Sequence, residues 1–369
     1  MTNSRRICPG LIYEPSDRRY TDGGRLFRGC PTVAITRGGR IFLGWYEGGT
    51  REPHIDNFNL VVYSDDGGET FSAPYLVIPG SRELGIHSLD IQLWVSDTGA
   101  LHVFWVQNHA EKTKDGIRPP LPDTQPWMSV DGYDFGDFEH AMWMSVCKDP
   151  DAEHPVFDEP RMVDRGFLRC KPTVVSENRI LFFNYDQLSD RYGYSISSDH
   201  GYSFSHRYGS AKIPTNFDEA MAYVRDDGSI RMLARTQGRY GYLAASISAD
   251  GGESWSDATL SNIKNPGSRF YISRLPSGRL LLVNNESSET RTNMALCLSE
   301  DDGESWKYKR VIDTRNHVSY PDCDFYGGRI YLTYDRERTG AREILFLDFT
   351  EEDIMNPDRA LNIRVVSKS

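Results

Sequence analysis

The stretch Ser64-Asp65-Asp66-Gly67-Gly68-Glu69-Thr70-Phe71 is one of four copies of a short pattern, Ser-x-Asp-x-Gly-x-(Ser/Thr)-(Phe/Trp). The other copies lie at 197–204, 248–255 and 299–306, so three of the four recur at an interval of 51 residues. Each copy follows an apolar or alternating segment and precedes a polar one, which is the usual setting of a hairpin turn. A fixed period of this size predicts a repeat architecture built from short strands.

The residue types inside the pattern suit a tight turn. Asp and Ser side chains bind nearby backbone N–H groups, glycine tolerates a positive φ, and the closing aromatic ring packs under the strands. A calcium loop is the functional alternative for the acidic runs, but the distal bidentate glutamate of that motif is missing. We therefore expect the pattern to have a structural role.

A second element recurs between the turns and consists of a leading strand, a turn and an apolar strand. Six such units lie at 30–48, 90–107, 171–187, 219–237, 272–287 and 322–337. A β-sandwich with coincidental turns would not keep the regular interval, whereas a ring of blades would. We predict an all-β fold, a six-bladed β-propeller of four-stranded blades in which the two chain termini share the last blade.

The interval between Ser64 and Ser197 is long enough to hold one further blade with an insertion. Ser145 marks a degenerate copy of the turn, and the insertion in this second blade covers about 108–140. The segment is rich in proline, aspartate and aromatic residues, which predicts a long loop. Trp127 within it is a candidate for an apolar or glycan-stacking contact, with a core tryptophan as the alternative.

Composition and charge narrow the class of protein. The repeat runs through most of the 369 residues, which predicts a single domain over 1–369. A net charge of -11 disfavours nucleic acid and anionic membranes as partners. The six cysteines are dispersed, so we expect free and mostly buried thiols rather than a zinc site. No signal peptide or membrane span is apparent, so a cytoplasmic protein is expected, or a secreted one if a signal has been removed.

Three arginines stand at comparable places in separate repeats. Arg28 precedes the first leading strand, Arg235 ends an apolar strand, and Arg291 comes shortly before the last turn. If they converge at the propeller axis, their guanidinium groups can bind a carboxylate ligand bidentately without ever losing their charge. The alternative is that they are surface or interblade arginines.

The turn pattern is the Asp-box, and together with the six strand-turn-strand units it resembles the sialidase (neuraminidase) superfamily over most of residues 25–350. The resemblance implies an exo-α-sialidase that hydrolyses terminal α-linked sialic acids by a retaining mechanism with a tyrosine nucleophile. It also implies that the partner is a sialylated glycan and that no metal or organic cofactor is needed. Because Asp-box propellers carry several functions, the activity has to be argued from the site.

The resemblance assigns the catalytic roles. Asp56, in the loop before the first Asp-box, takes the place of the acid/base aspartate. Tyr320, ahead of the last blade's leading strand, takes the place of the nucleophile. Glu219 resembles the glutamate that activates it, with the adjacent Asp218 as a weaker alternative.

The resemblance also assigns the substrate-binding roles. Arg28, Arg235 and Arg291 would hold the substrate carboxylate, although FRGCP at 27–31 has one residue inserted relative to the family's Arg-Ile-Pro signature. Asp335 stands where the family has a glutamate that supports the first arginine. Glu337 and Glu47 are alternatives for that support.

Two other functions stay open. The first is a hydrolase or lyase for another acidic sugar, such as Kdn, Kdo or a uronate, in which the same arginines hold a different carboxylate. The second is a non-catalytic glycan-binding propeller, against which the full set of polar site candidates argues.

Overall fold

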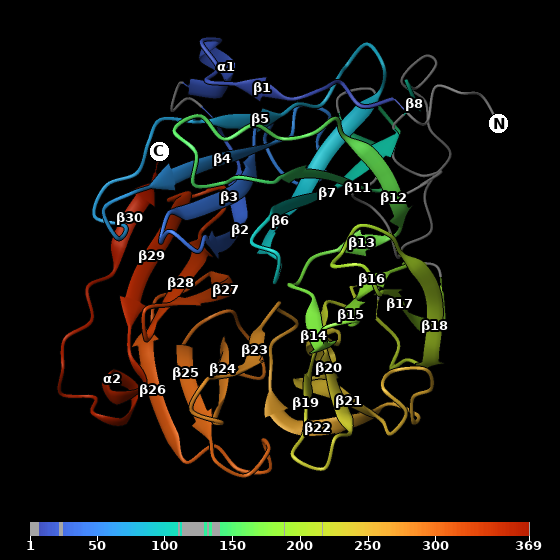
Figure 1. Ribbon diagram of the computed structural model, residues 1–369, viewed down its shortest axis with the longest axis vertical. Coiled ribbons are helices and arrows are strands. Elements are labelled where there is room, and N and C mark those ends of the chain that lie inside the picture. The colour runs from blue at the N-terminus through green and yellow to red at the C-terminus, as the bar shows by residue number, and fades with distance from the viewer. Residues whose placement is uncertain are drawn as a thin grey trace.

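The computed structural model describes residues 7–21, 25–109, 111–112, 129–130, 133–134, 141–187, 189–215 and 217–368. Figure 1 shows antiparallel sheets that follow one another around a ring in chain order, from the blue N-terminal sheet to the red C-terminal one. Within this part of the chain, six sheets of four or five strands form the blades. The prediction of an all-β, six-bladed propeller is confirmed. Trp127 lies outside the described residues.

Within each blade, the strands run in chain order from the axis outward. The first three blades are β2 (Arg28–Ile35), β3 (Ile41–Glu47), β4 (Phe58–Ser64) and β5 (Leu76–Ile78); β6 (Ile86–Val95), β7 (Leu101–His109), β11 (Ala141–Cys147) and β12 (Arg161–Arg165); and β14 (Thr173–Ser176), β15 (Arg179–Phe182), β17 (Arg191–Ser197) and β18 (Ser205–Ala211). The last three are β19 (Ala220–Val224), β20 (Ile230–Ala234), β21 (Tyr242–Ser248) and β22 (Thr259–Lys264); β23 (Tyr271–Arg274), β24 (Leu280–Asn285), β25 (Met294–Ser299) and β26 (Tyr308–Asp313); and β27 (Val318–Tyr326), β28 (Arg329–Arg336), β29 (Glu343–Phe349) and β30 (Arg364–Ser367).

Smaller elements decorate the ring. A two-stranded pair joins β13 (Phe167–Leu168) to β16 (Asn184–Tyr185), and a three-stranded sheet joins β8 (Glu111–Lys112), β10 (Tyr133–Asp134) and β9 (Ser129–Val130). The helical segments described are α1 (Arg18–Thr21), η2 (Gly238–Tyr240) and α2 (Glu351–Met355).

The hydrophobic core lies between neighbouring blades. Phe42 of the first blade packs in one cluster with Leu101 and Trp105 of the second. Because both faces of a blade are covered, β2, β3 and β11 are buried along their whole length and lack the alternation of a half-exposed strand. All six cysteines are free and five are buried, as expected.

The Asp-box turns have the structural role that the sequence predicts. In the first, the Ser64 hydroxyl donates to Asp66 Oδ1 at 2.7 Å and accepts from the Gly68 N–H at 2.9 Å. Phe71 packs edge-on against Phe346 of the sixth blade, with ring centroids 5.3 Å apart. A Cβ at Gly68 would lie 2.2 Å from the same ring, so only glycine fits there. The turn therefore fixes the contact between two blades.

The ring closes differently from the prediction that the termini share a blade. All four strands of the sixth blade come from the C-terminal part of the chain, and β1 (Ile12–Tyr13) pairs with β5 at the outer edge of the first blade. Side chains of β27 close the ring instead. Asp322 accepts from the Thr32 hydroxyl at 2.7 Å and the Val33 N–H at 2.9 Å, and Asp324 accepts from the Ile35 N–H at 2.8 Å. These bonds satisfy the inner edge of β2, so no shared strand is needed.

Two buried cations hold the inner strands together at the axis. Arg269 donates to the carbonyl oxygens of Arg169 at 2.9 Å, Pro31 at 2.6 Å and Tyr320 at 2.9 Å. Lys171 donates to the carbonyls of Val33 and Leu93 and lies 3.0 Å from Asp322. The residues that these cations hold belong to the first, second, third and sixth blades, so the centre of the ring is a fixed platform.

Candidate functional site

Cys30, Asp90 and Tyr320 occupy the same place in three blades. Each lies where the pairing of the innermost strand with its neighbour shifts register, in β2, β6 and β27, which marks a β-bulge. All three have a φ of 56°, a conformation that residues other than glycine rarely adopt. A bulge re-aims the side chain that it carries. Cys30 and Tyr320 meet in one buried cluster as a result.

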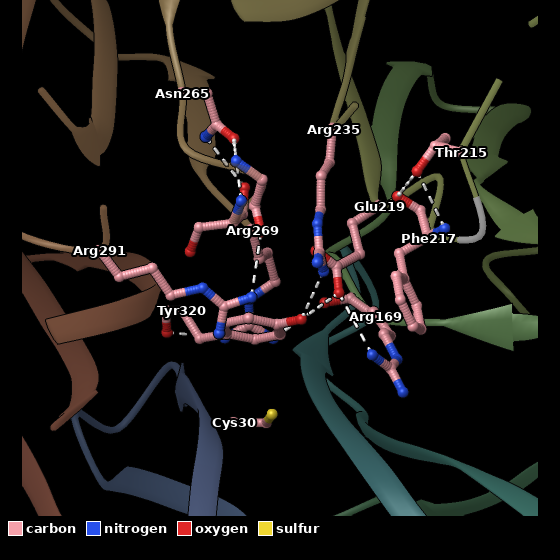
Figure 2. A network of polar contacts seen from close by, with 12 residues as sticks. Cys30, Arg169, Thr215, Phe217, Glu219, Arg235, Asn265, Arg269, Arg291 and Tyr320 are labelled. Carbon is pink, nitrogen blue, oxygen red and sulfur yellow. Dashed lines mark hydrogen bonds and ion pairs between the residues drawn. The ribbon is translucent and has the colours of Figure 1, made fainter. Parts of the chain in front are cut away.

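Tyr320 is joined to Glu219 and Arg235, as the resemblance implies. The tyrosine hydroxyl donates to Glu219 Oε1, and Arg235 Nη1 donates both to Glu219 Oε2 at 2.9 Å and to the tyrosine oxygen at 2.8 Å. Figure 2 shows this triangle, with Tyr320 reaching across from the sixth blade to two residues of the fourth. The neighbouring Asp218 instead pairs with Lys212 at 2.7 Å, so Glu219 is the carboxylate at the tyrosine.

The protonation states of the pair follow from its surroundings. Burial raises the pKa of Tyr320 to about 12, with Arg235 acting in the opposite direction. Burial also acts to raise the pKa of Glu219, but Arg235, Arg169 and the tyrosine hydroxyl outweigh it and hold the pKa at about 2. At neutral pH the pair is thus a protonated tyrosine bonded to an ionised glutamate.

Arg291 lies against the ring of Tyr320, with its guanidinium carbon 5.2 Å from the ring centroid. Its Nη2 donates to the Gly267 carbonyl at 3.0 Å, and no carboxylate of the described residues lies within ion-pair distance of it. Burial accordingly lowers the pKa of its guanidinium. A half-buried cation without an anionic partner is costly, and an anionic ligand would relieve that cost.

Tyr320, Arg235 and Arg291 line a cavity of about 240 Å³. Its polar lining is completed by Arg169, Glu52, Asn108 and Gln187, and its apolar lining is Pro53, Leu89, Phe167 and Phe217. Such a mixture of apolar walls and a few converging polar groups is typical of a small-molecule site. Arg169 and Arg235 are already paired with Glu219, so Arg291, which has no carboxylate partner among the described residues, is the cation that favours an anionic ligand.

Asp56 is not among the residues that line this cavity. It lies beside a larger hollow of about 970 Å³, together with His54 and Arg82. Its carboxylate is paired with the Arg82 guanidinium, and its side chain is 41% exposed. Glu52, from the same loop, lines the cavity that contains Tyr320.

Arg28 also lies away from the cavity lining. Its Nε donates to Glu47 at 2.6 Å and its Nη1 to the Arg342 carbonyl at 3.1 Å, so Glu47 supports it as one of the predicted alternatives. Asp335 accepts instead from the Cys30 N–H at 2.8 Å and from Arg338 Nε at 2.9 Å. The arginine that Asp335 supports is therefore Arg338.

Sequence reasoning missed four charged residues of the site: Arg169, Asp90, Glu52 and Arg338. Arg169 Nε donates to Asp90 at 2.7 Å and its Nη1 to Glu219 Oε1 at 3.3 Å. Burial raises the pKa of Asp90 to about 6, opposed by Arg169. One signal was available, because Arg-Cys-Lys-Pro-Thr at 169–173 parallels Arg-Gly-Cys-Pro-Thr at 28–32.

Comparisons with known proteins agree with this architecture. Residues 39–328 match the family model described as BNR repeat-like domain. A sialidase of Micromonospora viridifaciens is 30% identical over 126 residues, which are 31% of this chain and 19% of that protein, so the chain spans a small part of its length.

Solved structures extend the likeness over most of the chain. The leech intramolecular trans-sialidase, complexed with 2,7-anhydro-Neu5Ac, has a TM-score of 0.69 at 15% identity and covers 95% of this chain and 71% of its own. The intramolecular trans-sialidase of Ruminococcus gnavus, in complex with oseltamivir carboxylate, has a TM-score of 0.67 at 17% identity. The match covers 96% of this chain and 99% of that protein. At these identities the likeness concerns the fold.

None of the helices in the described ranges has the length and apolar character that crossing a bilayer requires. With four Asp-box turns, six blades in the described part of the chain and a family match over residues 39–328, the chain belongs to the BNR repeat-like domain family and is a propeller of the sialidase superfamily.

Proposed function

We propose that the protein is an exo-glycosidase that removes terminal α-linked sialic acids by a retaining mechanism with Tyr320 as the nucleophile. The observation that carries the proposal is the hydroxyl of Tyr320 bonded to Glu219, in a cavity where Arg291 has no carboxylate partner among the described residues. The sialidase likeness of sequence and fold supports it.

The chemistry of the substrate explains the choice of nucleophile. The anomeric carbon of a sialoside carries a carboxylate, which would repel an anionic nucleophile but not a neutral phenol. As the tyrosine oxygen bonds to that carbon, its proton passes to Glu219 and the glycosidic C–O bond breaks. Water then attacks the anomeric carbon and gives one proton to the carboxylate that acted as the general acid. As the tyrosyl–sugar bond breaks, the proton on Glu219 returns to the tyrosine oxygen. Arg291 and Arg235 would hold the substrate carboxylate during both steps.

The leaving oxygen needs a proton from a general acid, and the loop between β3 and β4 offers two carboxyl groups. Asp56 is the residue that the resemblance assigns to this role. Glu52 is the residue of the same loop that lines the Tyr320 cavity. The experiment compares Asp56→Asn with Glu52→Gln on a sialoside with an activated aryl leaving group and on one with a sugar leaving group.

Loss of the general acid slows the sugar leaving group far more than the aryl one, because a good leaving group departs without protonation. The variant that shows this split, by a ratio of about 100-fold, identifies the acid. A split in Glu52→Gln and none in Asp56→Asn would overturn the Asp56 assignment.

The substrate class is tested with 4-methylumbelliferyl glycosides of Neu5Ac, Kdn and Kdo and with a glycoside of a uronate. We expect turnover of the Neu5Ac glycoside, with the α-anomer of the free sugar as the first product seen by NMR. Turnover of the others alone would overturn the sialidase proposal in favour of another acidic sugar. An anhydro sugar as product would replace hydrolysis by intramolecular transfer, and an unsaturated uronate product would indicate a lyase.

A glycan-binding propeller without activity predicts tight binding and no turnover by the wild-type protein. Calorimetry with Neu5Ac, beside the turnover assay, decides between the two. Binding that persists unchanged in Tyr320→Phe, with no turnover in the wild type, would overturn the enzymatic proposal.

A further inference from the structure

Of the cations in the described ranges, Arg338 lies nearest to the centre of the Tyr320 ring. Its guanidinium carbon lies 4.1 Å from the ring centroid, compared with 4.9 Å for Arg269 and 5.2 Å for Arg291. It comes from the hairpin between β28 and β29 of the sixth blade. The resemblance gives it no role, because it is Arg28 that matches the family's first arginine.

The guanidinium of Arg338 is held by carboxylates from two blades. Its Nε donates to Asp335 at 2.9 Å, and its Nη1 donates to Glu52 Oε1 at 2.6 Å across the closure between the sixth and first blades. Its Nη2 is buried without a hydrogen-bond partner among the described residues. Two anchors fix the plane of the group, and the planar fork of an arginine suits such double anchoring better than a lysine would.

The side chain of Arg338 packs against the backbone of the first blade at Gly29. A Cβ on Gly29 would lie 2.8 Å from both Cγ and Cδ of Arg338, which is closer than such atoms approach one another. The Arg28 N–H donates to the Arg338 carbonyl at 2.9 Å, so the two segments are also tied by their backbones. Gly29 lies within FRGCP, and its lack of a side chain is what admits Arg338.

We propose that Arg338 is a positioning residue of the reaction, which fixes the ring of Tyr320 for attack and joins it to Glu52 at the cavity wall. The proposal rests on the proposed function. Arg28 cannot take this role while its guanidinium is bound by Glu47 and the Arg342 carbonyl.

The chemistry needs such a group because charge moves at Tyr320 during the attack. The tyrosine oxygen becomes partly negative as its proton moves to Glu219, and a fixed cation against the ring favours that change. Since Arg338 does not line the cavity, its effect should appear in the rate of bond formation and not in the binding of substrate. No other reactant is required.

The test is Arg338→Lys, which keeps the charge but not the planar double anchor, and Gly29→Ala, which displaces the side chain without removing it. The probe is a 2,3-difluoro derivative of sialic acid, whose tyrosyl adduct accumulates and is followed by intact-protein mass. We expect adduct formation to slow by about 100-fold in Arg338→Lys and about 10-fold in Gly29→Ala. The dissociation constant of the initial complex should change by less than about threefold.

Arg336→Lys on the same hairpin is the matched control and should react like the wild type. An unchanged rate in Arg338→Lys overturns the proposal, and so does a rate loss that comes entirely from weaker initial binding. A crystal structure of Arg338→Lys tests the proposal without any turnover, because an unmoved Tyr320 ring would overturn it. Failure of the wild type to form an adduct would instead count against the proposed function.

Discussion

The Asp-box turns and the innermost strand bulges come from the same repeat, yet they differ in kind. In the four turns, the serine hydroxyl donates to the aspartate at 2.7, 2.8, 2.7 and 2.8 Å, so one geometry is copied around the ring. At the three bulges the backbone is also alike, with a φ of 56° each. The bulge side chains, however, are a thiol, a carboxylate and a phenol: Cys30, Asp90 and Tyr320.

A repeat can thus standardise the backbone while leaving the side chains at the axis free to differ. The turns lie on the outside and join blades, so each must keep the same bonds. The bulges meet at the centre, where unlike groups can complement one another. Four variants or conditions test this contrast between the rim, formed by the Asp-box turns, and the centre, formed by the bulges and the residues that they contact.

The largest effect is expected at the centre, from Tyr320→Phe. Removing the hydroxyl should lower kcat by at least about 10³-fold, because the proposed nucleophile is lost. Glu219 keeps its bonds to Arg235 and Arg169, so the melting temperature should fall by no more than about 3 °C. Steady-state kinetics and calorimetry check both values, and a variant with kcat close to that of the wild type contradicts the assignment.

The second largest effect is expected in the pH dependence of the free energy of unfolding, and it comes from the titration of Glu219. Its folded pKa of about 2 lies below the ordinary value of 4.5, so its contribution is complete above that value and is lost as the pH falls toward 2. The loss amounts to about 3 kcal/mol in the free energy of unfolding. Urea unfolding of the wild type and of Glu219→Gln should show a difference that narrows over this range. If the difference in unfolding free energy between the two proteins stays constant over this range, the group that titrates is not Glu219.

Arg291→Met should weaken substrate binding by about 10–100-fold, because a charge-assisted bond to the substrate carboxylate is removed. Since Arg291 has no carboxylate partner among the described residues, its loss should leave the melting temperature unchanged or higher. Arg231→Met is the control for both measurements, because Arg231 lies on the fourth blade, away from the cavity, and pairs with the exposed Glu304 of the fifth blade. A large fall in melting temperature without a change in binding would make Arg291 a structural residue.

The smallest effect is expected at the rim, from Ser248→Ala in the third Asp-box. The Gly252 N–H, which donates to the serine oxygen at 2.8 Å, would lose its partner. The free energy of unfolding should fall by about 1 kcal/mol and the melting temperature by about 1–2 °C, with kcat/KM unchanged. A change in kcat/KM would show that the rim and the centre are coupled.

The rim could be predicted from the sequence because its bonds are local. Ser64 and Asp66 accept hydrogen bonds from backbone N–H groups of their own turn, so pattern and structure coincide. The Tyr320–Glu219–Arg235 triangle could be placed because its residues lie close to the ends of strands in a regular repeat. Their assignment to catalysis stays a prediction.

The position of Arg338 could not be predicted, because it depends on contacts across the closure of the ring. The hairpin Asp335-Arg336-Glu337-Arg338 offers two arginines, and nothing in their order says which one reaches Glu52 and Gly29. The same holds for the loop that carries Glu52 and Asp56. Which of them faces the cavity is decided by the path of the backbone and not by spacing.

The contact between β2 and β27, made by Asp322 and Asp324, determines when the site can form during synthesis of the chain. The first strand of the ring is made early in synthesis, but its inner edge stays unpaired until the sixth blade emerges. That last blade also supplies Tyr320, Asp335 and Arg338. A nascent or truncated chain that lacks it would have neither a closed ring nor a nucleophile, so completion of folding and gain of activity become one event.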